Sequence, residues 1–190
     1  AENSDAWTIT FELTNASGGV ELAESNLAMT VTRSIFELIF SENWEYGSSA
    51  DNITALSEWE RYSGEEQPIR YTPEGLTFAG YPAETGGAIN LVNGPEVKED
   101  IERPMNPVTT GTIYSAQLVN ASSASSSQYF FGLRSEGSGY YNRLYAKDDG
   151  SGNLLFGTAL NRAGGGYEVY SSTLYDYNTT YLLVVKYDFE

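Results

Sequence analysis

The amino-acid sequence predicts an all-β protein. Hydrophobic residues make up 41% of the 190 residues, which is enough for a buried core, and 15 residues are Tyr. Tyr and Thr favour pleated, half-buried surfaces, and the 19 Gly residues suit a fold with many turns. Apolar and polar residues also alternate in several segments, which is typical of strands with one buried face. The length allows one β-sandwich, or one sandwich and part of another.

The chain is strongly acidic, with a net charge of −16 and a pI near 4.2. Binding to phosphate backbones needs clustered Lys and Arg, so we expect no nucleic-acid partner. The charge also disfavours anionic membrane surfaces, and no segment has the length and apolarity of a membrane span, so we expect no membrane insertion. The simplest interpretation of the charge is solubility through mutual repulsion, although it leaves room for calcium as a cofactor.

The chain contains no Cys and no His. Structural disulfides, thiolate zinc sites and Cys nucleophiles are therefore excluded. The absence of His removes the usual catalytic base, the Ser-His-Asp triad and nearly all transition-metal sites. A secreted protein without Cys is ordinary for a bacterial source.

Residues 1–34 show two strand patterns separated by a turn. Apolar residues alternate with Thr and Glu over 6–14, and with Ala and Thr over 27–32. Between them, Asn15-Ala-Ser-Gly-Gly19 has the composition of a turn. We therefore expect a β-hairpin. Because a lone hairpin is not stable in water, we expect it to pack on something else.

The segment Trp7-Thr-Ile-Thr-Phe-Glu-Leu-Thr-Asn-Ala-Ser-Gly-Gly-Val-Glu-Leu22 is followed by the strand Thr30-Val-Thr32. This arrangement resembles the last two strands of a Calx-β domain. The resemblance implies that residues 1–34 are the C-terminal hairpin of such a domain, whose earlier strands are not in this chain. Glu2 and Asp5 would then join a calcium cluster only with partners outside this chain.

Residues 35–190 form the second expected domain, in which a short apolar bridge or first strand over 34–40 leads into further strands. Strands follow at 114–119, 129–133, 143–150 and 155–157, and a long one ends the chain. The Ser-rich stretch 121–127 is expected to be a mobile surface loop, and the Gly-rich stretch 161–167 a tight hairpin.

The most apolar strand pattern is Thr180-Tyr-Leu-Leu-Val-Val-Lys-Tyr-Asp-Phe-Glu190. A strand of this composition needs neighbours on both sides. We therefore expect the chain to be a piece of a longer protein with an incomplete second domain, or a sheet that another polypeptide completes by strand addition.

The second domain contains the motifs Tyr129-Phe-Phe131, Lys147-Asp-Asp149, Phe156-Gly157 and Asn178-Thr-Thr-Tyr-Leu-Leu-Val-Val-Lys-Tyr187. Their order resembles that of a concanavalin A-like, LamG-type jelly-roll module of secreted Bacteroidetes proteins. The resemblance implies a jelly-roll sandwich, truncated at its C-terminus, on a protein exported by the type IX secretion pathway. It also implies an extracellular or cell-surface location.

Acidic residues provide no convincing catalytic pair. Glycoside hydrolysis needs two carboxylates on opposite sides of the sugar bond. Glu42 and Glu45 are three positions apart but lie in a turn-like segment, and Glu58, Glu60, Glu65 and Glu66 lie in a polar stretch. We expect solvated loop charges here, and no enzyme.

The segment 147–153 is the candidate calcium site. Asp148, Asp149 and Asn153 provide oxygen ligands, together with backbone carbonyl groups. The segment lacks the full Asp-x-Asp-x-Asp-Gly series and a distant Glu. The alternative is a hairpin turn, because Asp-Gly is a strong turn signal.

Aromatic side chains provide the candidate glycan site. Tyr140 and Tyr141 are adjacent, so on a strand they would point to opposite faces and one of them would be free to stack on a sugar. Cross-strand packing is the alternative for each Tyr. Further candidates are Tyr167, Tyr170, Tyr175 and Tyr177, whereas Trp44 and Trp59 are expected in the core.

These features favour a non-catalytic structural or adhesive module of a large bacterial secreted or cell-surface protein, accompanied by weak glycan or calcium binding. Two alternatives stay open. One is a carbohydrate-binding module of a multidomain exported enzyme, and the other is a filament subunit completed by strand exchange with a neighbour. The expected partners are other domains of the same polypeptide, neighbouring subunits or a polysaccharide.

Overall fold

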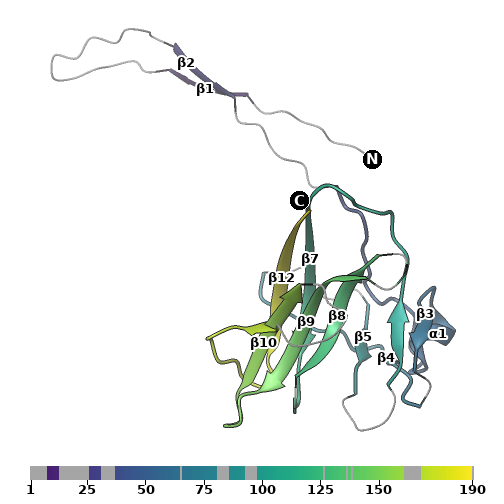
Figure 1. Ribbon diagram of the computed structural model, residues 1–190. Coiled ribbons are helices and arrows are strands. Elements are labelled where there is room, and N and C mark those ends of the chain that lie inside the picture. Colours follow the sequence, from purple (N-terminus) through teal and green to yellow (C-terminus); the bar gives the residue numbers. More distant parts are fainter. Residues whose placement is uncertain are drawn as a thin grey trace. The chain divides into compact units, whose positions relative to one another are not determined.

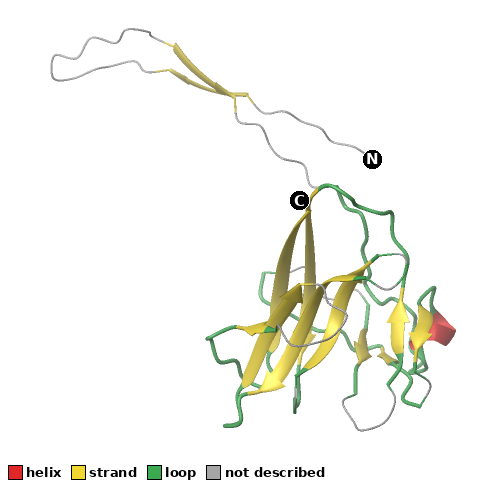
Figure 2. Ribbon diagram, in the orientation of Figure 1, coloured by secondary structure: helices red, strands yellow, loops and turns green. Residues whose placement is uncertain are grey.

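The computed structural model confirms an all-β protein built from antiparallel strands (Figures 1 and 2). It describes residues 8–12, 26–30, 37–64, 66–80, 86–92, 98–125, 127–135, 137, 139–160 and 168–189. The chain divides into two compact units, residues 1–40 and residues 41–190, whereas the boundary expected from the sequence lay at residue 34.

The first unit contains the antiparallel strand pair that the sequence predicts. Strand β1 (Thr8–Glu12) pairs with β2 (Asn26–Thr30), and the register places Ile9 opposite Met29 and Phe11 opposite Leu27. The predicted turn at residues 15–19 lies outside the described residues. The assignment of this pair to a Calx-β-like domain stays a prediction.

The second unit contains one short helix and ten strands in its described part. The helix α1 (Ile53–Leu56) has four residues, and within the described part of the chain no helix is long and apolar enough to cross a membrane. The strands are β3 (Glu60–Ser63), β4 (Arg70–Thr72), β5 (Ala88–Asn90), β6 (Asp100–Glu102), β7 (Gly111–Asn120), β8 (Gln128–Arg134), β9 (Tyr140–Asp148), β10 (Leu154–Leu160), β11 (Val169–Tyr170) and β12 (Thr180–Phe189).

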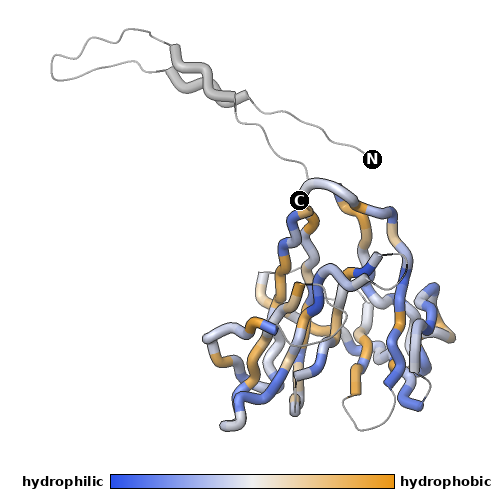
Figure 3. Tube along the Cα trace, viewed as in Figure 1, coloured by the Kyte–Doolittle hydropathy of each residue, from blue (hydrophilic) through white to orange (hydrophobic). Residues whose placement is uncertain are grey.

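Two sheets of the second unit pack face to face. A four-stranded sheet has the order β11-β10-β9-β8, and the long pair β12-β7 lies behind it in Figure 1. Aromatic rings join the layers: the Phe156 and Tyr181 ring centroids are 5.8 Å apart, and those of Tyr141 and Tyr187 are 6.0 Å apart. Hydrophobic and hydrophilic residues are interspersed along these strands (Figure 3), as expected for sheets with one buried face.

A second cluster of buried residues lies among the shorter strands. Ile53, Ile69 and Tyr71 form its centre, next to the pairs β3-β6 and β4-β5. Gly87 is required beside it, because a Cβ at this position would lie 2.0 Å from the Thr72 carbonyl oxygen and 2.5 Å from the Tyr71 ring. The backbone at Gly87 therefore packs closely against Thr72 and Tyr71, although the strands of this region are short.

The long final strand is confirmed, and its surroundings are more open than its composition predicts. β12 pairs with β7 in an unbroken register of ten residue pairs, from Thr180 opposite Asn120 to Phe189 opposite Gly111. Among the described residues, β7 is its only strand partner, so the other edge of β12 has no strand neighbour there. Val184 on β12 and Tyr114 on β7 are 59% and 48% exposed.

Three other expected segments have different outcomes. The described part of the expected bridge or first strand, residues 37–40, has no regular structure, which favours the bridge over the strand. The Ser-rich loop follows β7 as predicted. Two backbone hydrogen bonds connect it to other segments: the Ala121 carbonyl accepts from the Asn178 amide, and the Ser125 carbonyl accepts from the Asp148 amide. The predicted tight hairpin at residues 161–167 lies outside the described residues.

Substitution of Leu154 tests the packing between the two sheets. Leu154 is 0% exposed, so Leu154→Ala is expected to lower the free energy of unfolding by about 2–5 kcal/mol through the cavity it leaves. Leu160, on the same strand but 70% exposed, is the matched control, and Leu160→Ala should change it by less than about 0.5 kcal/mol. Urea unfolding measures both, and equal effects would contradict this account of the core.

Candidate functional site

One face of the four-stranded sheet carries an array of Tyr rings and cationic side chains. Tyr129 on β8, Tyr145 on β9, Gly157 on β10 and Tyr170 on β11 are directly opposite one another across the strands, so their side chains share that face. We call this array the Tyr–cation face. It consists of Tyr129, Arg134, Tyr140, Arg143, Tyr145, Lys147 and Tyr170.

A β-bulge brings Tyr140 onto this face. β8 and β9 pair Leu133 with Asn142 and then Arg134 with Tyr140, which leaves Tyr141 as an extra residue on β9. An extra residue shifts the alternation of side chains by one position. Consequently Tyr140 contacts Arg143, three positions further along the strand, and Tyr141 contacts Tyr187 and Phe189 in the other sheet.

The cations of the Tyr–cation face stack on its rings. The Arg143 guanidinium carbon lies 3.7 Å from the Tyr140 ring centroid and 4.8 Å from that of Tyr129. The Lys147 ammonium nitrogen lies 3.9 Å from the Tyr170 ring centroid. Each contact is a cation–π interaction, worth about 0.5–1 kcal/mol at an exposed position. These contacts hold the charged groups in place against the sheet.

Glycines beneath the rings make this flat arrangement possible. A Cβ at Gly157 would lie 2.6 Å from the Tyr170 ring, so the ring occupies space that any other residue would fill. A Cβ at Gly132 would lie 3.4 Å from the Arg143 Cγ, so the aliphatic part of Arg143 also crosses the sheet directly above a glycine. The Tyr170 ring and the Arg143 side chain therefore lie close to the backbone at Gly157 and Gly132.

Acidic side chains of β6 contact the β8 side of the Tyr–cation face. Arg134 Nη1 lies 2.7 Å from Glu102 Oε2, and its guanidinium also lies 3.8 Å from the Tyr62 ring centroid. The Tyr129 hydroxyl donates to Asp100 Oδ2 at 3.0 Å. Burial and the Asp100 carboxylate raise the pKa of the Tyr129 hydroxyl well above its ordinary value, so it remains a donor at neutral pH.

The predicted glycan residues therefore differ in their surroundings. Tyr140 lies on the Tyr–cation face, whereas Tyr141 packs between the sheets, in line with the opposite directions expected for adjacent strand residues. Tyr170 joins the face. Tyr175 packs with Phe156 and Tyr181 at centroid distances of 5.1 Å in each case. Tyr167 lies outside the described residues.

The remaining candidate, Tyr177, lies between β11 and β12 and contacts Asp148, one of the predicted calcium ligands. Its hydroxyl donates to Asp148 Oδ2 at 2.8 Å, and burial followed by this bond raises the pKa of Tyr177 to about 12. Asp148 Oδ1 accepts from the Gly150 amide at 2.7 Å. Both carboxylate oxygens of Asp148 thus have donors within the protein.

Asp149 is equally well satisfied. Its Oδ1 accepts from the Ser151 amide at 2.7 Å and from the Asn153 amide at 3.0 Å, and its Oδ2 accepts from the Asn153 side-chain amide at 2.8 Å. These bonds, led by the one from the Asn153 side chain, lower the pKa of Asp149. The contacts are those of a hairpin turn, with Gly150 and Gly152 at φ of 86° and 89°. Calcium binding by Asp148, Asp149 and Asn153 stays a prediction.

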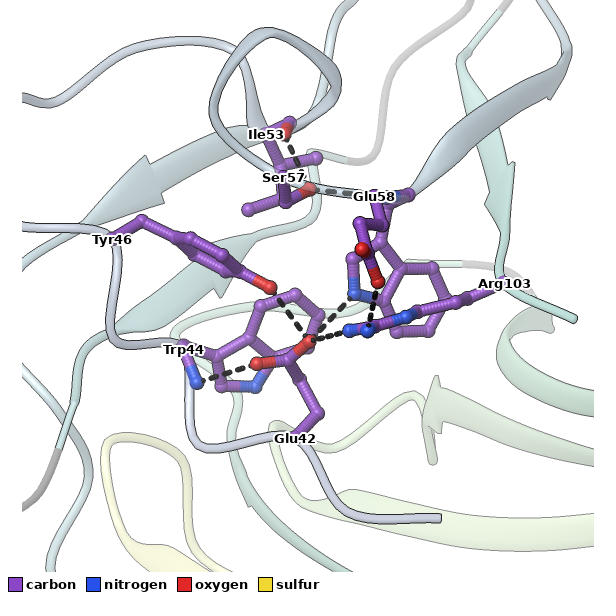
Figure 4. Close-up of polar contacts among 8 residues, drawn as sticks. Glu42, Trp44, Tyr46, Ile53, Ser57, Glu58 and Arg103 are labelled. Carbon is purple, nitrogen blue, oxygen red and sulfur yellow. Dashed lines mark hydrogen bonds and ion pairs between the residues drawn. The ribbon is translucent and has the colours of Figure 1, made fainter. Parts of the chain in front are cut away.

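The acidic residue Glu42 is not a solvated loop charge, which corrects the sequence-based expectation (Figure 4). Its side chain is 9% exposed. Its Oε1 accepts from the Trp44 amide at 2.8 Å, and its Oε2 accepts from the Tyr46 hydroxyl at 2.8 Å and from the Trp59 Nε1 at 3.0 Å. Arg103 Nη1 lies 2.9 Å from the same Oε2. Glu45, by contrast, is exposed.

The surroundings of Glu42 are part of the smaller core. Trp44 and Trp59 stack with centroids 5.4 Å apart and pack against Ile53, Ile69 and Tyr71, as their predicted core role requires. Trp44 has a φ of 56°, a left-handed conformation that costs a residue with a Cβ roughly 1–2 kcal/mol. The bond from its amide to Glu42 offsets part of that cost. Glu42 therefore links the Trp44, Tyr46, Trp59 and Arg103 side chains of this cluster.

Comparison of the chain with protein-family models, with curated proteins and with solved structures finds no match. The geometry described above is therefore the basis for any functional assignment. Sequence reasoning selected Tyr140 and Tyr170 but missed Tyr129, Arg143 and Lys147. The alternation Arg143-Leu-Tyr-Ala-Lys147 was the available signal, because it places two cations and a Tyr on one side of a strand.

The role of Glu42 is tested by its pH dependence. Burial raises the pKa of this carboxyl, but the bonds from Trp59, Trp44 and Tyr46 and the charge of Arg103 together lower it below its ordinary value of 4.5. A lowered pKa in the folded state means that the carboxylate stabilises the fold at neutral pH and that this stabilisation is lost as the pH falls through the folded-state pKa.

Glu42→Gln is accordingly expected to lower the free energy of unfolding by roughly 1–3 kcal/mol at pH 7, with a shrinking difference from the parent protein below pH 4. Urea unfolding between pH 7 and pH 3 measures it. Glu45→Gln is the control and should show almost no effect, since Glu45 is exposed and, among the described residues, accepts a hydrogen bond only from Asn43, two positions away. A pH-independent loss for Glu42→Gln would contradict the electrostatic account.

Thermal unfolding of Asp149→Ala distinguishes the turn from a calcium site. Loss of the acceptor for three donors should lower the melting temperature. A turn predicts the same loss in EDTA and in millimolar calcium. If calcium raised the melting temperature of the parent protein and not that of Asp149→Ala, the calcium site would be established.

Proposed function

We propose that this chain is a non-catalytic adhesive module that binds glycans through its Tyr–cation face. The observation that supports the proposal is the row of Tyr rings and cations across β8, β9 and β11, of which Tyr129 is 37% exposed. Sugar rings have an apolar C–H face that stacks on aromatic rings, and hydroxyl groups that bond to nearby polar groups. The Tyr–cation face offers both kinds of contact.

The module is proposed to act outside the cell, on a large bacterial secreted or cell-surface protein. The resemblance of the sequence motifs in residues 35–190 to those of concanavalin A-like jelly rolls supports this assignment, and the two packed antiparallel sheets agree with it at the level of a β-sandwich. A carbohydrate-binding module tethered to an enzyme elsewhere in the same polypeptide would use the same face. The two roles differ in the parent protein, not in the contacts made by this chain.

A second candidate function is completion of the β7-β12 sheet by a neighbouring subunit. It is favoured by one observation: over ten residue pairs β12 bonds to β7, and no other described strand pairs with either. Such edges accept an added strand through backbone hydrogen bonds. Electron microscopy of the concentrated protein tests this candidate, because regular fibres would support strand exchange between copies and a uniformly monomeric sample would oppose it.

Glycan binding is tested with a panel of immobilised neutral and acidic polysaccharides. Saturable binding to at least one is expected, and Tyr140→Ala should weaken it about tenfold, equivalent to loss of a stacking contact of roughly 1.4 kcal/mol. Tyr114→Ala is the matched control, since Tyr114 is a 48% exposed Tyr on the other sheet and should leave binding unchanged. Absence of binding across the panel, or equal losses in both variants, would contradict the proposal.

A further inference from the structure

We propose that the glycans bound by the Tyr–cation face are acidic ones, whose carboxylate or sulfate groups contact Arg143 and Lys147. This inference rests on the proposed glycan-binding function and names the ligand class. The inference depends on which cations of this acidic chain have a carboxylate partner and which do not.

Three other cations of the second unit pair with nearby carboxylates. Arg103 bridges Glu42 and Glu58, Arg134 pairs with Glu102, and Lys186 pairs with Asp188. Arg143 and Lys147 differ, because no described carboxylate lies within ion-pair distance of either. Both lie instead against Tyr rings, Arg143 against Tyr140 and Lys147 against Tyr170. Two positive charges are thus left uncompensated on one strand.

Arg143 also retains hydrogen-bonding capacity that the protein does not use. Its Nε is buried and has no hydrogen-bond partner in the structure. A buried donor without an acceptor is uncommon in folded proteins and costs stability. A guanidinium presents its donors as a planar fork that matches a carboxylate or sulfate, so an oxyanion is the chemical group that complements Arg143 best.

The two free cations are spaced along β9 with an aromatic ring between them. Arg143, Tyr145 and Lys147 occupy alternate positions on one side of the strand, so the cations are about 13 Å apart along it at roughly 3.3 Å per residue. The rings of Tyr140 and Tyr170 hold the two charged groups in place, which reduces the entropy lost when a ligand binds. Tyr145 itself is only 7% exposed, so a chain of sugars with repeated acid groups would contact the two cations on either side of this ring.

The overall charge of −16 limits how such a ligand is recognised. It repels a polyanion at long range, so attraction is confined to within about 8 Å of Arg143 and Lys147 at physiological salt. The site would therefore bind acidic glycans by direct contact and not by electrostatic steering. Calcium bridging between two acidic partners is a separate mechanism, which EDTA removes.

The experiment compares a polyuronate with its methyl ester, which has the same sugar backbone without the charge. Calorimetry with the full chain in EDTA should show binding to the polyuronate about tenfold or more tighter than to the ester. In Arg143→Gln the two affinities should converge to within about twofold, and Arg143→Lys should fall between because it keeps the charge and loses the fork. Lys147→Gln should produce a smaller loss of the same kind.

Lys186→Gln is the matched control, because Lys186 is a cation on the other sheet that already pairs with Asp188, and it should bind the polyuronate like the parent protein. Circular dichroism melting confirms that each variant is folded. Equal affinity for polyuronate and ester, with both weakened by Tyr140→Ala, would overturn the acidic-ligand inference while leaving glycan binding in place. Binding to neutral polysaccharides with none to the polyuronate would overturn it equally. No binding to any glycan would overturn both proposals.

Discussion

The β-bulges between β8 and β9 determine which side chains the four-stranded sheet presents on each face. Phe130 on β8 and Tyr141 on β9 are the extra residues. Without the bulge at Tyr141, strict alternation would place Tyr141 beside Arg143 and turn Tyr140 toward the β7-β12 layer. With it, Tyr141 packs on Tyr187 and Phe189, and Tyr140 lies beneath the Arg143 guanidinium. One backbone irregularity therefore serves both the packing of the sheets and the composition of the candidate site.

Local irregularity also shapes the smaller core. There, carboxylate side chains accept hydrogen bonds from backbone N–H groups that a longer strand pair would otherwise satisfy. Glu42 accepts from the Trp44 amide, and Glu99, which is 7% exposed, accepts from the Ile69 amide at 2.7 Å. Buried backbone N–H groups need acceptors, and the strands of this region have only three or four residues each. Some of the acidic residues are thus structural parts of the fold, and the net charge of the chain does not reveal which ones.

The sequence was sufficient for the parts of the fold that depend on composition and alternation. The all-β class and the long final strand followed from composition, and the pairing of the first two strands followed from residues that alternate with period two. The sequence was insufficient where the backbone departs from that period. Tyr140 was selected for its neighbour Tyr141, but its actual partner is Arg143, which a regular strand would place on the other face. Glu42 was misassigned because its partners Trp59 and Arg103 are 17 and 61 positions away.

The Tyr–cation face and the open strand pair lie on different surfaces of the second unit. Gly157 contributes to the Tyr–cation face, and its neighbour Phe156 points to the opposite side, where it meets Tyr181 of β12. A glycan bound across Arg143 and Lys147 would therefore contact one side of the four-stranded sheet, while a strand added to β7 or β12 would extend the layer on the other side. Because neither contact uses the residues of the other, adhesion and strand exchange are compatible in one molecule. An exported module with both would present its Tyr–cation face repeatedly along an assembly, and repeated weak sites gain affinity for a long polymer through multivalency.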